Sequence, residues 1–552
     1  MNAKELPARP SLEHYKKQAK DLLKACKDRD PESLQRIKKY HLRFDKLSDS
    51  EFARIKIALA DAQLAIAREH GFESWPKFAK RIEELAAQVF LAGITDPLAA
   101  FMEAAGVARD GSSHGSGTLE RANAILAAHP EIARRNIYTA AILGDDVEVR
   151  KFIALDAGSA TAKGGPSGWD ALTYLCFSRY LRLNKARSDG FKTAAKALLD
   201  AGANPNTGWF EKNHQPEPEW ESVLYGAAGV AHHAELTRIL LERGADPNDG
   251  ETPYHAPEAY DNDALKVLVE SGKLNDDSLG VILLRKTDWH DYEGIKWLLE
   301  HGVNPNLITR WGKAALHHAV LRDNDRKIIE VFLDHGADPT IVAEPLKQAG
   351  HSLTGKSAIA MAAWRGRRDL LELFEQRGFS VDLQGVEKLI AACARNDSPG
   401  IALIAEREPQ LLAELLECGG TLLPLFAGTA NRDGVRELLD LRVPVNALYK
   451  EGDGYFDIAE NSTALHVAAW RAWPAVVKLL IERGAPVNAV DGKGRMALAL
   501  AVRACVDSYW RYRRTPESVE ALLRAGASVD GVEFPCGYAE VDELLHRLGK
   551  MD

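Results

Sequence analysis

Cysteine is scarce in this chain, and the cysteines that are present follow no regular spacing. The 552 residues include six cysteines, none of them in a Cys-x-x-Cys pair. A zinc ribbon or a disulfide framework needs paired cysteines at regular intervals, so neither is expected. Free, mostly buried thiols in a reducing compartment are the simplest interpretation.

Long apolar runs are missing as well. No stretch of about 18 consecutive apolar residues, the length that a membrane-spanning helix needs, occurs in the sequence. Residues 1–30 lack the apolar segment of an export signal and are rich in Lys and Glu. We therefore expect neither membrane insertion nor export, and we expect the protein to be cytoplasmic.

Positive charge is in deficit and unevenly distributed. The chain has 70 Lys and Arg against 79 Asp and Glu, a formal net charge of −9. Residues 1–92 contain 19 Lys and Arg against 14 Asp and Glu, a net of +5, which leaves 51 against 65, a net of −14, for the rest. So small an excess favours a solvated helical surface over a nucleic-acid site, and nucleic acid is not an expected partner.

One phrase is repeated along the chain: two apolar residues, two further residues that are usually charged, a glycine, and often an Asp-Pro or Asn-Pro pair. Copies lie at 198–206, 240–248, 298–306, 332–340, 481–488 and 522–530. The apolar residues fit the end of an amphipathic helix, and the glycine fits the left-handed position just past that end. The copies lie at intervals near 33 residues with additions of roughly nine, which indicates an array of one supersecondary unit.

A second motif precedes several of these helices. It reads Thr-Ala-Leu-His-Val-Ala at 463–468, Ala-Ala-Leu-His-His-Ala at 314–319 and Thr-Pro-Tyr-His-Ala at 252–256. With the glycine phrase at a fixed offset, it resembles the ankyrin repeat. The resemblance covers residues 136–530 and implies an all-α fold, an ankyrin-repeat α-solenoid of about eleven helix-turn-helix units. Between Gln384 and Leu412 the stop glycine is missing, and Arg442 takes the stop position of the next unit.

The other segments are expected to be helical additions to this array. Residues 1–92 predict a helical N-terminal leader, in which 61–77 resembles the leader of many bacterial ankyrin-repeat proteins and implies a bacterial origin. We expect linker and capping helices at 93–135 and a C-terminal capping helix at 531–552. The Gly- and Ser-rich stretch 110–117 contains the Gly-x-Ser-x-Gly pattern of hydrolases around Ser113, but no strand is expected before it, so it predicts a flexible linker.

Histidines and acidic residues give no sign of a metal site. The resemblance implies that His255, His317 and His466 bond backbone groups near the turns and join neighbouring repeats. The adjacent pairs at 232–233 and 317–318 cannot place two ligands on one helix face. The acidic loop 451–461 lacks the spacing of a calcium loop and is expected to be solvated. No metal, cofactor or catalytic residue is expected.

Trp-Arg pairs mark the expected binding surface. The resemblance implies that partners are contacted by hairpin tips and by the residues that follow the paired alanines of the inner helices. These positions hold Arg310 and Trp311 at a tip, and Trp364, Arg365, Trp470 and Arg471 after the alanines. Trp and Arg dominate interface hot spots because they bury area and still offer donors. The alternative is that the tryptophans fill junctions between helices.

Two insertions hold further aromatic candidates. Residues 207–221 predict a long loop, and residues 506–516 lengthen the step between two helices. Their candidate contact residues are Trp209, Phe210 and Trp220 in the first and Tyr509, Trp510, Arg511 and Tyr512 in the second. Basic residues interleaved with aromatics can grip an acidic peptide, close over a small ligand or stack bases. A tolerated surface insertion is the alternative.

Taken together, these features predict an interaction protein that binds a protein or peptide partner on the concave face of the array. The alternative is a small-molecule site, or an unusual enzymatic pocket, between the long insertions and that face. No nucleophile–base pair or pair of carboxylates supports catalysis.

Overall fold

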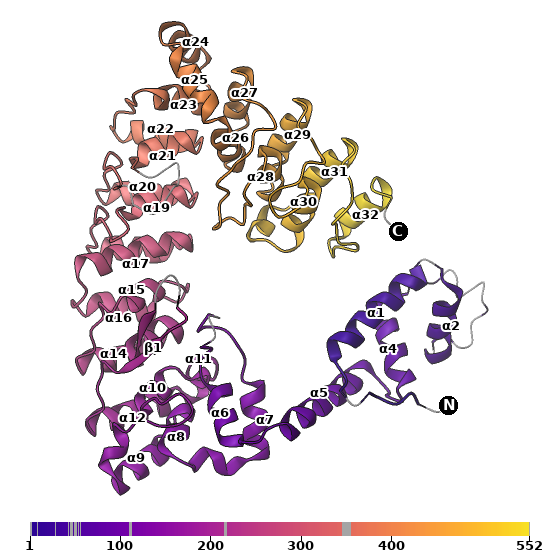
Figure 1. The fold of residues 1–552 in the computed structure, drawn as a ribbon, viewed down its shortest axis with the longest axis vertical. Helices are drawn as coiled ribbons and strands as arrows, with labels where there is room; N and C mark the ends of the chain where they lie inside the picture. The colour runs from indigo at the N-terminus through magenta and orange to yellow at the C-terminus, as the bar shows by residue number, and fades with distance from the viewer. Residues whose placement is uncertain are drawn as a thin grey trace. The chain divides into compact units, whose positions relative to one another are not determined.

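The computed structural model describes residues 3–550 apart from positions 8, 28, 42, 45–47, 49–51, 53–54, 56, 110–112, 215–217 and 345–354. It divides into two units, Met1–Asp246 and Pro247–Asp552, and each is described by itself. Helices dominate both units (Figure 1). Among the described residues, no single helix is long and apolar enough to cross a membrane, although two consecutive helices, bent by 69° at Cys418, pass that test together.

The first unit begins with four helices around a small core. They are α1 (Leu12–Lys27), α2 (Pro31–Tyr40), α4 (Leu59–Glu69) and α5 (Trp75–Ala92). Asp30 caps α2 by accepting a hydrogen bond from the Ser33 N–H at 2.8 Å, as expected of a short polar side chain before Pro31. Tyr15 and Phe78 pack edge to face in the core, with ring centroids 4.9 Å apart.

The rest of the first unit is a series of short helices with one β-hairpin. The α-helices are α6 (Pro97–Ala105), α7 (Glu120–Ala128), α8 (Ile137–Leu143), α9 (Asp146–Leu155), α10 (Ala171–Cys176), α11 (Arg179–Leu183), α12 (Ser188–Asp200), α13 (Val223–Tyr225) and α14 (Ala234–Glu242). Strands β1 (Gly208–Glu211) and β2 (Glu219–Ser222) pair antiparallel, with Trp209 opposite Glu221. The segment that the sequence predicts as a loop therefore forms a hairpin.

The second unit repeats pairs of antiparallel helices. They are α15 (Glu251–His255), α16 (Asp263–Glu270), α17 (Asp276–Asp288), α18 (Tyr292–Glu300), α19 (Ala315–Leu321), α20 (Arg326–Asp334), α21 (Ala358–Trp364), α22 (Arg368–Gln376), α23 (Val386–Arg395), α24 (Ser398–Arg407), α25 (Gln410–Glu417), α26 (Gly419–Gly428), α27 (Arg432–Asp440), α28 (Ala464–Trp470), α29 (Pro474–Glu482), α30 (Ala497–Val506), α31 (Glu517–Arg524) and α32 (Ala539–Arg547). Helices α17, α19 and α21 pack in succession, as do α26, α28 and α30.

The stop residues of the repeated phrase adopt the left-handed conformation that the sequence predicts. The stop residues Gly302, Gly336 and Gly484 are left-handed, with φ of 82°, 83° and 82°. Arg442 holds the same conformation, with φ of 72°, which confirms that it replaces a stop glycine. The final Asn of the phrase joins repeats: the Asn306 side chain donates to the Gly336 carbonyl at 2.9 Å and accepts from a backbone N–H of the next hairpin at 2.8 Å.

The motif histidines follow the implied role at two of three positions. The Nε2–H groups of His317 and His466 donate to the carbonyls of Ile341 and Ala489, at 2.8 and 2.9 Å. His255 differs, because its ring nitrogens lie about 3 Å from the carboxylates of Glu251 and Glu258. Burial alone lowers the pKa of His255, but these two carboxylates raise it to about 9.

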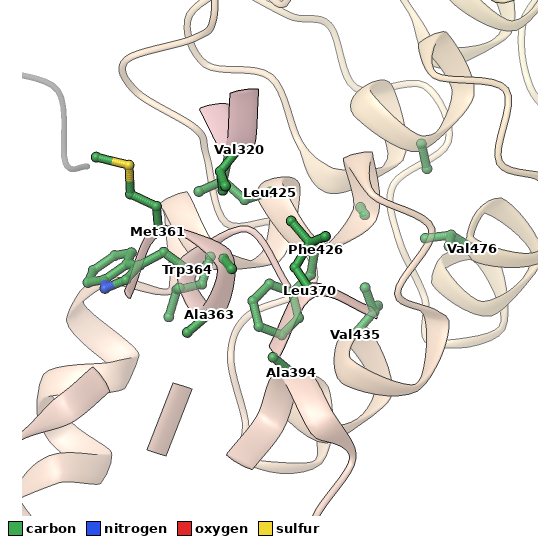
Figure 2. Close-up of a cluster of buried hydrophobic side chains, with 14 of the residues drawn as sticks. Val320, Met361, Ala363, Trp364, Leu370, Ala394, Leu425, Phe426, Val435 and Val476 are labelled. Carbon is green, nitrogen blue, oxygen red and sulfur yellow. The ribbon is translucent and has the colours of Figure 1, made fainter. Parts of the chain in front are cut away.

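The missing stop glycine marks a change in helix packing. Helix α24 ends at Arg407 without a left-handed stop, and α25 begins three residues later at Gln410. Around this break α21 contacts α26 as well as α23, and α23 packs on α27. The second unit therefore contains two runs of helix pairs, before and after α23–α25 (Figure 1). Figure 2 shows the apolar cluster at the break, where Phe426 of α26 lies among Leu370, Ala394 and Val435.

Gly366, just after α21, offers a test of this packing. It is left-handed, with φ of +68°, and a Cβ there would lie 2.7 Å from the Phe426 ring. We expect Gly366→Ala to lower the free energy of unfolding by about 2–4 kcal/mol, because it combines backbone strain with overpacking. Gly378 is also left-handed, but no described atom lies within 4 Å of the same position, so Gly378→Ala is expected to cost about 1 kcal/mol. Equal losses in urea unfolding would contradict the contact of α21 with α26.

Candidate functional site

A buried carboxylate ties the two runs of the second unit together. Asp323, just after α19, accepts two hydrogen bonds from Arg365, both at 2.6 Å, and one from Arg471 at 2.9 Å. The three side chains are 3–7% exposed. Burial alone raises the pKa of Asp323, but the two guanidinium groups hold it well below its usual range. The ends of α19, α21 and α28 therefore meet at one charged centre.

A second carboxylate strengthens this junction. Asp288, at the end of α17, accepts hydrogen bonds from Arg322 Nε at 2.5 Å and from His318 Nε2 at 2.9 Å, and it also pairs with Arg285. Burial lowers the pKa of His318 to about 3, so the imidazole is neutral and donates its one N–H to Asp288. The Tyr455 hydroxyl donates to the Asp288 backbone carbonyl at 2.6 Å.

The loop 451–461 belongs to this junction, so the prediction that it is solvated is wrong at Phe456, although Glu451 and Glu460 are exposed as predicted. Phe456 is buried, and the Arg471 guanidinium lies 4.0 Å from its ring centroid. The Trp470 Nε1–H donates to the Phe456 carbonyl at 2.5 Å. Asp457 pairs with Lys493, Arg495 and Arg503. Contacts with Arg471 and Trp470 hold the loop at Phe456, and three basic residues hold it at Asp457.

Four of the six predicted concave-face residues are therefore inside the protein. Trp364 and Trp470 are each 6% exposed, and Arg365 and Arg471 are also buried. The expectation that they line an open surface is wrong, because the break at α23–α25 lets both Trp-Arg pairs pack within the second unit. Trp364 donates its Nε1–H to Glu387 at 3.1 Å, and the Lys356 ammonium lies 4.6 Å from its ring centroid.

Arg310 and Trp311 remain at the surface, as the sequence predicts for a hairpin tip. Arg310 is exposed and Trp311 half-buried. The Arg310 guanidinium lies 5.2 Å from the Trp311 ring centroid, and Trp311 meets Tyr254 edge to face at 5.7 Å. The tip thus presents a cation and an indole held by neighbouring aromatics.

The second insertion forms a short 3-10 helix, η5 (Tyr509–Arg513), whose two tyrosines are exposed. Tyr509 and Tyr512 are 56% and 72% exposed, and Arg511 is exposed. The side chain of Trp510 lies outside the described residues. Arg513 turns inward: it donates to the Arg471 carbonyl at 2.9 Å, and its guanidinium lies 3.8 Å from the Trp473 ring centroid.

Arg513 lines a hollow of about 640 Å³, which we call the arginine hollow. The N-terminal ends of α20, α22, α27 and α29 border it, and the partial positive charge of a helix N-terminus favours an anion. Its charged lining residues are Asp323, Asp325, Arg326, Arg367, Arg368, Asp369, Glu372, Arg432, Asp433, Arg471 and Arg513. The sequence identifies Arg471 and the insertion but gives no sign that these helix ends converge.

Electrostatics favours an anion in this hollow. Burial lowers the pKa of Arg471, and nearby Asp323 offsets only part of that effect. Burial also lowers the pKa of Arg513 to about 10, helped by repulsion from Arg471. A guanidinium with a lowered pKa is a cation whose surroundings offset its burial incompletely. A carboxylate or phosphate in the hollow would therefore be stabilised.

The predicted contact residues of the first insertion lie on opposite faces of the hairpin in the first unit. Trp209 is buried, whereas Phe210 and Trp220 are 53% and 41% exposed and lie opposite each other on the two strands. Trp209, Phe210 and Trp220 belong to the first unit, whereas the insertion that contains Tyr509 belongs to the second.

This succession of helix pairs, left-handed stops and joining histidines defines a helical repeat protein. The family model for ankyrin repeats in three copies matches residues 286–385, and the model for a single ankyrin repeat matches residues 460–492. These segments are therefore ankyrin repeats, and the predicted ankyrin-repeat resemblance and the predicted fold class are confirmed. The bacterial origin, the cytoplasmic location and the domain boundaries stay predictions.

Solved structures of other proteins are similar to part of the chain. The human ASB11 ankyrin repeat domain is 22% identical, over 44% of this chain and 97% of that chain, with a TM-score of 0.19. No curated protein matches the chain.

Proposed function

We propose that this protein is an interaction module whose second unit binds an acidic segment of a partner protein at the arginine hollow. Ankyrin repeats are in general protein-interaction modules. The observation that carries the proposal is the convergence of four helix N-termini and six arginines on one hollow of about 640 Å³. The exposed rings of Tyr509 and Tyr512 on η5, the helix that supplies Arg513, offer apolar contact area for the same partner.

Most acidic residues in the lining are paired with its arginines, and six arginines against five acids leave the hollow a small excess of positive charge. Asp369 pairs with Arg367 at 2.8 Å and Glu372 with Arg368 at 2.7 Å. The Arg432 guanidinium lies 3.9 Å from Asp433. A partner carboxylate would add to these pairs and receive the helix N–H groups as well.

Charge reversal at the hollow tests the proposal. Arg368 and Arg432 are partly exposed and begin α22 and α27, where a glutamate is tolerated because it complements the helix dipole. We expect Arg368→Glu with Arg432→Glu to weaken binding of a fluorescein-labelled Glu-Gly peptide by at least about tenfold, measured by fluorescence anisotropy at low salt. Added salt should weaken binding to the wild type.

Two comparisons make this titration decisive. Arg407→Glu with Arg524→Glu removes the same charge from exposed positions outside the hollow and should leave binding within about twofold of the wild type. A Lys-Gly peptide should bind more weakly than the Glu-Gly peptide. Equal losses in the two double variants would show attraction by net charge alone and would remove the hollow from the proposal.

We also propose that the tip formed by Arg310 and Trp311 contacts the partner, since an exposed cation beside an indole is a frequent hot-spot pair. Once a partner has been captured and its acidic segment mapped by cross-linking, the same titration with Arg310→Ala and Trp311→Ala examines this contact. A loss of affinity without a change in melting temperature supports it, and unchanged affinity removes it.

A further inference from the structure

The first unit buries a cluster of metal-binding side chains at its hairpin. Glu211 on β1 and Glu221 on β2 are 4% and 0% exposed, and His114 lies against both. His114 Nε2 is 2.8 Å from a Glu211 oxygen, and its Nδ1 is 3.9 Å from a Glu221 oxygen. The stretch 110–117 is therefore no plain flexible linker, because its histidine is buried; positions 110–112 lie outside the described residues.

The hairpin register brings the two carboxylates together. Side chains alternate between the faces of a strand, so Trp209 and Glu211 share the buried face of β1, and Glu221, opposite Trp209, shares that face from β2. A hairpin exposed on both faces would place such acids in water. This one turns them towards His114 and Tyr225, whose hydroxyl is 2.8 Å from His114 Nδ1.

Burying two carboxylates in this cluster costs free energy unless their negative charge is neutralised. Burying an ionised carboxylate costs far more than burying a neutral group, so buried acids are protonated, paired or bound to a metal ion. A protonated His114 would supply one positive charge beside the two carboxylates. The second oxygen of Glu211, Oε1, is buried and has no hydrogen-bond partner among the described residues. Glu211 therefore keeps one acceptor oxygen that no described hydrogen bond uses.

We infer that His114, Glu211 and Glu221 bind a divalent transition-metal ion such as Zn²⁺. One donor atom from each residue lies within 4.8 Å of the others, and donors bound at about 2.1 Å must lie within roughly 4 Å of one another, so small side-chain movements close the site. Imidazole with two carboxylates is a donor set typical of zinc, manganese and iron.

An adjacent cavity has one of the three donors, Glu211, in its wall. A hollow of about 530 Å³ lies at the hairpin, with Trp209 and Glu211 in its wall. Arg109, Lys163 and Lys212 also line it. A buried metal site needs an entry path. The cationic lining further indicates that an anionic ligand could reach the bound ion.

Metal titration of the full chain tests the site. Protein stripped with a chelator is titrated with Zn²⁺ against a chromophoric competitor, and with Co²⁺ while visible absorption is followed. We expect one tight site per chain, and Glu211→Gln or His114→Asn should weaken it by at least about 100-fold. The matched changes Glu235→Gln, at an exposed helix start, and His129→Asn, at the end of α7, should bind as the wild type does.

Melting of the metal-free proteins separates binding from folding. Glu211→Gln removes a buried charge and keeps the shape, so without metal it should melt at or above the wild-type temperature. Added Zn²⁺ should raise the melting temperature of the wild type but not of this variant. If the wild type binds no tight equivalent, or if Glu211→Gln and the wild type respond alike to Zn²⁺, the cluster is an internal hydrogen-bonded group and the inference is wrong.

Discussion

Asp323→Asn is expected to lower the free energy of unfolding of the second unit by about 3–5 kcal/mol, because it leaves buried Arg365 and Arg471 without the carboxylate that they share. The backbone does not explain such a loss. Asp323 has φ of 51°, and asparagine adopts this left-handed conformation as readily as aspartate. The change therefore isolates the charge.

Two measurements check this expectation. Repeat arrays can unfold in parts, so urea unfolding followed by circular dichroism is combined with hydrogen exchange at α19, α21 and α28. Asp325→Asn, two residues on and exposed, serves as control and should change stability by less than about 0.5 kcal/mol. Adding Arg471→Leu to Asp323→Asn should recover part of the loss, because it removes one of the two stranded cations. Equal stability of the two Asn variants would contradict the role of Asp323.

Lowering the pH tests the same interaction, because protonation of Asp323 removes its charge. The pKa of Asp323 is depressed in the folded state, so the carboxylate contributes stability above its unfolded pKa of about 4, and that stability is lost as the pH falls below this value. Asp323→Asn has no proton to gain. The difference in stability between the wild type and this variant should therefore shrink on acidification below about pH 4.

The repeat could be read from the sequence because its signals are local. A glycine after two apolar residues requires a left-handed stop wherever it occurs, and Gly302 and Gly484 behave alike although they lie far apart in the chain. The same reasoning identifies Arg442 as an unusual stop. The roles of His317 and His466 follow from one repeated word, since their bonds reach only as far as the neighbouring hairpin.

The site could not be read in the same way, because it depends on the break between two runs of repeats. The Ala-Ala-Trp-Arg motif predicts that a Trp and an Arg lie at the end of an inner helix, but it does not predict which residues they contact. In the second unit the opposite group is Asp323, which is 148 positions from Arg471 along the chain. The missing stop glycine after Gln384 signals irregular packing, but it does not give the direction in which the next helices run.

His114 was missed for a related reason. Glycine and serine around it predict a linker by composition. The fold nevertheless buries the imidazole against a hairpin almost 100 residues away, with Glu211 97 positions along the chain. Short-range composition describes how freely a segment could move alone. It contains no information on a charged partner that holds the segment in place.

Trp470→Ala carries the second large expected effect, a loss of about 3–5 kcal/mol in the free energy of unfolding. The indole is 6% exposed, packs with Phe456 and Leu500, and donates its Nε1–H to the Phe456 carbonyl. Alanine leaves a cavity and also frees the loop 451–461, so hydrogen exchange should rise in that loop as the melting temperature falls.

Trp470→Phe separates the contribution of the ring volume from that of the hydrogen bond. It keeps most of the ring volume and loses the hydrogen bond, so it should cost less than Trp470→Ala and still leave the buried Phe456 carbonyl without its donor, at about 1–3 kcal/mol. Trp220→Ala, at an indole that is 41% exposed in the first unit, should change stability far less. A loss below about 1 kcal/mol for Trp470→Ala would place this indole at the surface, where it could serve a partner directly. A large loss would place the indole in the core beside Arg471, whose carbonyl accepts a hydrogen bond from Arg513 at the wall of the arginine hollow.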